Sequence, residues 1–300
     1  MKTWSLFRTT AVVALAVALL LSGCGGRTDE STIILYGREN NSGTYMYFKE
    51  HVLNKADFAS NVQTLPGTAA VINAVSKDPR SIGYGGIGYV KGVKVIPVKK
   101  DDNSPAVDAS LQNVVNGSYP MSRNLYFYTV QEPQGAVRHF IAWVLGDEGQ
   151  EVCQKVGYYP LPPERRPQLK SSEAPPEKKT ITVKGSDTMV ILGQRWAEHY
   201  MQKFPGVVVQ VTGGGSGTGI AALINGATSI CESSRPLDEK ERGQIKAKFG
   251  KDPVEIPVAM DGLAVFVHES NPLKSITLAE LNAIYTGKVR SWREFGSTSK

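Results

Sequence analysis

Four short clusters of glycine, serine and threonine each stand before a stretch that predicts a helix. They are Gly-Ser-Asp-Thr at 185–188, the glycine-rich loop 213–219, Asn-Ser-Gly-Thr at 41–44 and Pro-Gly-Thr at 66–68. Small residues let a ligand approach the backbone, and the first turn of a helix has unpaired N–H groups at its positive dipole end. Each cluster alone could be an ordinary cap or turn. Four clusters of the same kind, converging on one cleft, would instead form an oxyanion site that needs no lysine.

Other chemistries have weaker support. The GxGxxG match at 83–88 precedes a predicted strand rather than the helix that a dinucleotide site requires, and the loop 213–219 lacks the Gly-Lys-Ser/Thr of a phosphate loop. Ser216 is not in a nucleophile elbow, because Thr218 stands where glycine is required. The four histidines have no evident Ser or Cys partner and no metal-ligand spacing. We therefore expect a protein that is not an enzyme and holds no metal or cofactor.

Strands alternate with helices along the chain, which predicts an α/β fold with largely parallel sheets. The predicted strands are 32–36, 93–98, 125–129, 180–184, 207–212 and 263–268, and the predicted helices are 43–53, 68–76, 137–145, 189–203, 219–225 and 278–285.

The segment 162–179 is the clearest break in this alternation. Five of its 18 residues are proline, and only Leu169 and Ala174 are apolar, so it predicts a linker. It separates residues 25–161 from residues 180–300. A chain of 300 residues suggests roughly two domains.

The N-terminus resembles a bacterial lipoprotein signal. Residues 1–23 hold Lys2, Arg8 and an apolar run of about eleven residues, too short for the roughly 20 that cross a bilayer. Leu-Ser-Gly then precedes Cys24, which we expect to be lipidated and to anchor the protein outside the cytoplasmic membrane. The alternative is a cleaved signal with an incidental cysteine.

The net charge and the two remaining cysteines indicate no specific function. The formal charge is +6, and removing Lys2 and Arg8 with the signal leaves +4, so no nucleic-acid partner is expected. Cys153 and Cys231 fit buried small hydrophobes, although secretion would also permit a disulfide between them.

Four segments together carry a specific resemblance. YGRENNSGTY, TITVKGSDTM, VTGGGSGTGI and NPLKSITLAELNAIYTGKVRSW are similar to the phosphate-binding protein of bacterial high-affinity phosphate ABC transporters. The resemblance covers about 32–159 and 180–296. It implies a two-lobed periplasmic-binding-protein fold (type II), with α/β lobes that close on a desolvated phosphate.

The two halves stand in exchanged order relative to that family. The half beginning TITVKGSDTM normally comes first, so the chain resembles a circular permutant whose ends, near Thr32 and residue 296, lie together. The resemblance then divides the chain into one lobe of 31–90 plus 263–300 and another of 91–161 plus 180–262. The linker 162–179 would join the usual C-terminus to the usual N-terminus.

The resemblance also implies the phosphate-binding residues. Arg38 matches the family arginine, with a surface pair to Glu39 or Glu50 as the alternative. Ser42, Gly43 and Thr44 match helix-start donors, Ser186, Asp187 and Thr188 lie in the first ligand loop, and Ser216 matches the serine of the glycine loop.

One family position differs in this chain. Many members place an aspartate about 15 residues after the glycine loop, where it accepts the phosphate proton; here Ser234 stands there. Asp187 and Asp261 could take over that role. The alternatives are that Asp187 caps the helix from Met189 and that Asp261 is a satisfied hinge residue.

The function implied is delivery of inorganic phosphate, by a monomer, to a membrane permease with ATPase subunits. Three alternatives stay open: a receptor for sulfate or molybdate, an enzyme of phosphate esters, and a surface lipoprotein in which the permutation has disabled transport.

Overall fold

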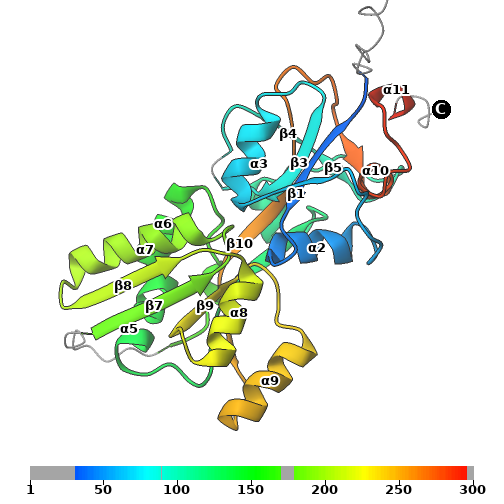
Figure 1. Ribbon diagram of the computed structural model, residues 1–300. Coiled ribbons are helices and arrows are strands. Elements are labelled where there is room, and N and C mark those ends of the chain that lie inside the picture. The colour runs from blue at the N-terminus through cyan, green and yellow to red at the C-terminus, as the bar shows by residue number, and fades with distance from the viewer. Residues whose placement is uncertain (1–30, 89, 170–178, 296–300) are drawn as a thin grey trace, which may run out of the picture.

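A computed structural model describes residues 31–88, 90–169 and 179–295 of the chain. The expected lipidation site Cys24, the expected signal segment 1–23 and residues 170–178 of the expected linker lie outside the described residues. Helices and strands alternate as the sequence predicts, and Figure 1 shows them in two groups on either side of the long strand β10.

The first group is built around the N-terminal strands and the C-terminal helices. Its elements are β1 (Ile34–Arg38), α2 (Gly43–His51), β2 (Gln63–Leu65), α3 (Gly67–Val75), β3 (Ser81–Gly86), β4 (Lys94–Ile96), β5 (Val98–Lys99), β11 (Ile276–Thr277), α10 (Leu278–Tyr285) and α11 (Trp292–Phe295). The short helix α4 (Leu111–Val115) follows β5 and contacts β10 and β6.

The second group holds the middle of the chain. Its elements are β6 (Ser122–Thr129), α5 (Gly135–Leu145), α6 (Asp147–Val156), the 3-10 turn η1 (Pro163–Arg165), β7 (Lys179–Gly185), α7 (Val190–Lys203), β8 (Val207–Thr212), α8 (Ser216–Asn225), β9 (Ile230–Ser233) and α9 (Glu239–Phe249). Strand β10 (Val254–Val267) connects the two groups.

Strand pairing is mixed rather than largely parallel. The hydrogen-bonded order is β2-β1-β3-β10-β6-β9-β7-β8, with β4 also on β10. The outer pairs are parallel, whereas β10 runs antiparallel to β3, β4 and β6, and β6 runs antiparallel to β9. One long strand therefore serves both groups: residues 263–267 pair with β3, and 254–262 pair with β6.

The same pairing corrects the expected boundary at residue 90. Strand β4 pairs with residues 265–267 of β10, and β5 pairs with β11. Residues 94–99 therefore lie with the first group, because backbone hydrogen bonds continue its sheet past residue 90. The other expected lobe boundaries stay a prediction.

The two ends of the described chain lie against each other. The Ile33 amide donates to the Arg290 carbonyl at 2.8 Å, and the Trp292 amide donates to the Ser31 carbonyl at 2.9 Å. Figure 1 shows β1 beside α10 and α11 accordingly. This is the arrangement that a circularly permuted chain requires.

The two cysteines described are separate and buried. Cys153 in α6 and Cys231 in β9 are both free and 0% exposed. They fill core positions as small hydrophobes, which was one of the two alternatives for them.

The shared strand makes a prediction about folding. Because β10 pairs with strands of both halves of the chain, neither residues 25–161 nor 180–300 expressed alone should fold cooperatively. Thermal melts followed by circular dichroism would check this, with residues 25–300 as the control. Two separate cooperative transitions, one from each half, would contradict it.

Candidate functional site

The four clusters of small residues meet between the two groups of elements. Thr44 Oγ1, in the first turn of α2, lies 2.7 Å from Thr188 Oγ1, which comes just before α7. The Gly217 amide of α8 donates to the Asn41 carbonyl at 2.9 Å. Thr68, at the start of α3, joins them through a bond from the Arg38 guanidinium at 3.3 Å.

Gly43 is placed where only glycine fits. A Cβ added there would lie 2.5 Å from Ser216 Oγ and 2.7 Å from Ser234 Oγ. The backbone at the start of α2 therefore touches both serine hydroxyls of the second group. This close approach brings the helix start and the two serines to one point.

The polar residues at this point are withdrawn from solvent. Each has an exposed fraction of 2% or less: Arg38, Ser42, Thr44, Ser186, Thr188, Ser216, Ser234 and Asp261. Buried polar groups are stable only when they find partners. The burial of eight such residues together marks this cluster as a site built for polar contacts.

Two hydroxyl groups of this cluster accept hydrogen bonds from backbone amides. Ser42 Oγ accepts from the Thr44 amide at 3.1 Å and from the Tyr45 amide at 3.4 Å. Ser216 Oγ accepts from the Ser234 amide at 3.2 Å. A hydroxyl that accepts from a fixed N–H keeps its own proton for another acceptor. The cluster can therefore donate several hydrogen bonds to an anion.

Arg38 is buried, not on the surface. Its guanidinium pairs with Asp187 Oδ2 at 3.3 Å, rather than with Glu39 or Glu50 as the alternative supposed. Its Nε is buried and has no hydrogen-bond partner among the described residues. Burial lowers the pKa of Arg38, while the nearby Asp187 acts in the opposite direction. A guanidinium held in this way has an N–H left for an anion.

Asp187 does not cap the helix that follows it. The N-cap of α7 is Met189, which has no side-chain cap bond. Asp187 Oδ1 instead accepts from the Gly214 amide at 2.7 Å, while Oδ2 accepts from Arg38. Asp187 thus connects the loop 185–188 to the glycine loop 213–219 and to β1.

Asp261 is a satisfied residue of the shared strand β10. Its Oδ2 accepts from Arg123 Nε at 2.9 Å and from Arg123 Nη2 at 2.6 Å, and its Oδ1 accepts from the Ile87 amide at 3.0 Å. The hinge alternative describes this geometry better than a role as the acceptor of a phosphate proton.

Sequence reasoning missed Arg123. Its only signal in the sequence is a lone arginine two residues before the predicted strand 125–129.

Glu232 in β9 is a second residue that sequence reasoning missed. Its side chain is 0% exposed, and neither carboxyl oxygen has a hydrogen-bond partner among the described residues. A Cβ added at Gly193 of α7 would lie 2.2 Å from Glu232 Oε1, so the carboxyl group packs directly against that helix. Burial, with a smaller contribution from Asp187, raises the pKa of Glu232 to about 8.

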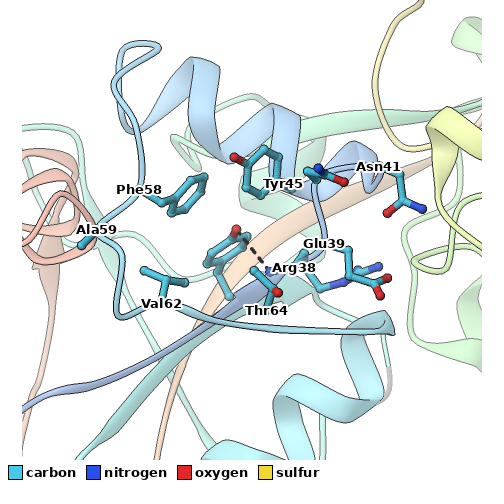
Figure 2. A pocket seen from close by; sticks show the side chains of 10 residues that line it. Arg38, Glu39, Asn41, Tyr45, Phe58, Ala59, Val62 and Thr64 are labelled. Atoms are coloured by element: carbon cyan, nitrogen blue, oxygen red, sulfur yellow. Dashed lines mark hydrogen bonds between the residues drawn. The ribbon is translucent and has the colours of Figure 1, made fainter.

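An open cavity of about 490 Å³ lies beside the cluster. Figure 2 shows Tyr45 and Phe58 on its wall, with Arg38 beside Glu39 and Asn41. The Arg38 amide donates to the Tyr84 hydroxyl at 3.4 Å (dashed in Figure 2). Arg38 is thus shared between the cavity and the buried cluster, whose serines do not line the cavity.

Two kinds of feature are absent from the described residues. Within 31–88, 90–169 and 179–295, no three His, Cys, Asp or Glu residues group as metal ligands would. In the same ranges no helix has the length and apolar character to cross a membrane.

Comparison with known proteins identifies the family. The model of the PBP superfamily domain matches residues 2–148 and 170–300. The chain belongs to the PBP superfamily. Its mixed sheet with helices on two groups of strands is the α/β fold expected of a periplasmic binding protein, and that expectation is confirmed.

Individual relatives within the PBP superfamily have names that refer to phosphate. "Phosphate-binding protein PstS 2" of Streptococcus agalactiae is 29% identical over 309 residues, covering 98% of this chain and 99% of the relative. "Phosphate-binding protein PstS" of Pseudomonas aeruginosa is 41% identical over 145 residues, 47% of this chain and 45% of the relative.

A solved structure of a phosphate-binding protein is also similar to this chain. The crystal structure of a phosphate-binding protein of a phosphate ABC transporter from Streptococcus pneumoniae superposes with a TM-score of 0.66 and 28% identity. The match covers 88% of this chain and 99% of that structure. The resemblance to phosphate-binding proteins of ABC transporters is thereby confirmed.

Proposed function

We propose that this protein binds inorganic phosphate outside the cytoplasmic membrane and delivers it to the permease of an ABC transporter with ATPase subunits. The observation that carries the proposal is the buried convergence of Arg38 with the hydroxyls of Ser42, Thr44, Thr188 and Ser216. These groups donate and come from both sides of the molecule. The names of the two relatives and of the pneumococcal structure point to the same ligand.

The proposed site residues are those that the resemblance implied, with roles adjusted to the geometry. Arg38, Ser42, Gly43, Thr44, Ser186, Thr188, Ser216 and Ser234 surround the anion. Asp187 orients Arg38 and the glycine loop, and Asp261 orients Arg123. The site works by binding and release, with no bond made or broken in the ligand.

Calorimetric titration tests the ligand directly. After exhaustive removal of phosphate, the chain should bind added phosphate, and sulfate at equal concentration should compete weakly. Equal or tighter binding of sulfate would favour the alternative of a receptor for another tetrahedral oxyanion. Turnover of a phosphate monoester would instead favour the enzyme alternative.

Arg38→Ala should weaken phosphate binding about tenfold or more. A hydrogen bond to a charged group contributes about 1.5–3 kcal/mol, and every 1.4 kcal/mol is tenfold in affinity. Arg38→Lys keeps the charge without the planar fork and should lie in between. Calorimetry measures both variants, with Arg195→Ala on the exposed side of α7 as the control. Wild-type affinity in Arg38→Ala would remove Arg38 from the site.

Anchoring through Cys24 is part of the proposal. A lipid on Cys24 would hold the protein at the membrane that it serves, as a monomer with no nucleic-acid partner. The variant Cys24→Ser should carry no fatty-acid label and should be misplaced or unprocessed in cell fractions. Normal labelling of that variant would contradict the anchor.

We also propose that the two halves are circularly permuted relative to those members of the resembled family in which the half beginning TITVKGSDTM comes first; the Streptococcus agalactiae relative matches this chain from end to end and is not among them. The support is the exchanged order of the motifs, together with the hydrogen bonds that join residues 31–33 to 290–292. Ends that already touch can be joined, and new ends opened in a surface loop, at small cost.

A further inference from the structure

Arg123 connects three parts of the molecule from a buried position in β6. Its Nε and Nη2 donate to Asp261, its Nη1 donates to the Ser234 carbonyl at 3.1 Å, and its Nη2 also donates to Thr44 Oγ1 at 3.0 Å. The side chain is 3% exposed, so these contacts replace water almost completely. Arg123 therefore joins the shared strand, the end of β9 and the start of α2.

The bond to Thr44 sets the direction of a hydroxyl proton. A guanidinium has only donors, so Thr44 Oγ1 must accept from Arg123. The proton of Thr44 is then directed to another acceptor, and Thr188 Oγ1 stands 2.7 Å away. Arg123 thus occupies one acceptor position of Thr44 Oγ1 and leaves the Thr44 proton available to an anion or to Thr188.

Asp261 pairs with the Arg123 guanidinium, so that Arg123 orients its neighbours and does not bind an anion directly. It neutralises the guanidinium from one side, and its other oxygen is held by the Ile87 amide that follows β3. The Tyr47 ring, whose centroid lies 5.3 Å from Arg123 Cζ, covers the guanidinium. The cation is therefore fixed by its neighbours, and its contribution to an anion passes through Thr44 and Ser234.

We propose that Arg123 is a positioning residue for anion binding: it holds the Thr44 hydroxyl in a donating geometry and fixes the Ser234 backbone through the Ser234 carbonyl. This inference rests on the proposed phosphate function. It assigns a role to a residue that none of the four small-residue clusters contains.

A double-mutant cycle on phosphate affinity tests the proposal. Arg123→Lys keeps the positive charge beside Asp261 but cannot reach Thr44 and Ser234 together, so phosphate should bind about tenfold more weakly. Thr44→Val should cause a loss of similar size. In the Thr44→Val background Arg123→Lys should cost much less than in the wild type, because the main contact that it removes is already absent.

Two controls make the cycle specific. Thr44→Ser retains a hydroxyl, so it should bind phosphate almost as the wild type does and should remain sensitive to Arg123→Lys. Arg195→Lys, on an exposed ion pair of α7, should leave affinity unchanged. Thermal melts of every variant identify losses that come from unfolding.

The outcomes separate the two proposals. Coupled losses from Arg123→Lys and Thr44→Val support the positioning role. Additive losses, or wild-type affinity in Arg123→Lys, overturn it while phosphate binding stands. If Arg123→Lys does not fold, equal affinities of Thr44→Val and Thr44→Ser overturn the role of the Thr44 hydroxyl and with it the inference. Absence of phosphate binding by the wild-type chain overturns the proposed function itself.

Discussion

Replacement of Asp261 by alanine is expected to lower the free energy of unfolding by about 3–5 kcal/mol. The pair of Arg123 and Asp261 is buried, with side-chain exposures of 3% and 0% and an N–O distance of 2.6 Å. Removing one partner leaves a charge in a site that water does not reach, and that loss is of this size in proteins. The Ile87 amide would lose its acceptor as well.

Denaturation by urea at neutral pH measures this effect. Glu198→Ala is the matched control, since it removes a carboxylate from the exposed pair with Arg195 and should change stability by less than about 1 kcal/mol. Asp261→Asn keeps the shape and an acceptor for Ile87, so its loss should be smaller than that of Asp261→Ala. A loss in Asp261→Ala no larger than in Glu198→Ala would contradict the account of the pair.

Glu232 is expected to make the stability of the protein fall as pH rises from 5 to 8. Burial raises its pKa from the usual 4.5 to about 8 in the folded chain. The folded state therefore binds more protons than the unfolded state between these values, and the stability present below the unfolded pKa is lost as pH rises through the folded pKa. With 1.36 kcal/mol for each pKa unit, the loss over this range is about 3 kcal/mol.

Glu232→Gln isolates this contribution. Glutamine is nearly isosteric and neutral at every pH, so the stability of the variant relative to the wild type should grow by about 3 kcal/mol between pH 5 and 8. Urea denaturation at several pH values measures the difference. Glu198→Gln, at an exposed position, is the control and should show little of this trend. An identical pH dependence for Glu232→Gln and the wild type would show that Glu232 is not a buried acid.

The local elements of the site could be predicted because their signals are short in range. A hydroxyl residue that caps a helix, as Ser42 caps α2, acts on amides two and three residues away. The alternating residues of β7 and the valine-rich run of β8 likewise carry their own pattern, and the predicted bounds of both strands differ from the structure by no more than one residue. The sequence therefore determined the helix starts that carry the donors, while Arg38 was expected from the family resemblance.

Strands without a side-chain pattern of their own could not be predicted in this way. Strand β3 is rich in glycine, and it is fully buried because α3 packs onto it: a Cβ at Gly83 would lie 2.6 Å from Val71 and 2.8 Å from Val75. Strand β10 extends nine residues before the predicted start at 263, because β6 supplies its backbone partners. Both depend on a neighbouring element that lies elsewhere in the sequence.

Some polar and ionisable groups of the site could be expected from the sequence, whereas others depend on the tertiary structure. The serine and threonine clusters indicate an oxyanion site by residue type and spacing, so the sequence by itself determined that expectation, whereas Arg38 was expected from the family resemblance. Arg123 and Asp261 are 138 residues apart, and only the pairing of β6 with β10 brings their charges together. The raised pKa of Glu232 likewise exists only after α7 covers β9 and removes water. Tertiary structure decided these features because desolvation and charge pairing depend on distance in space.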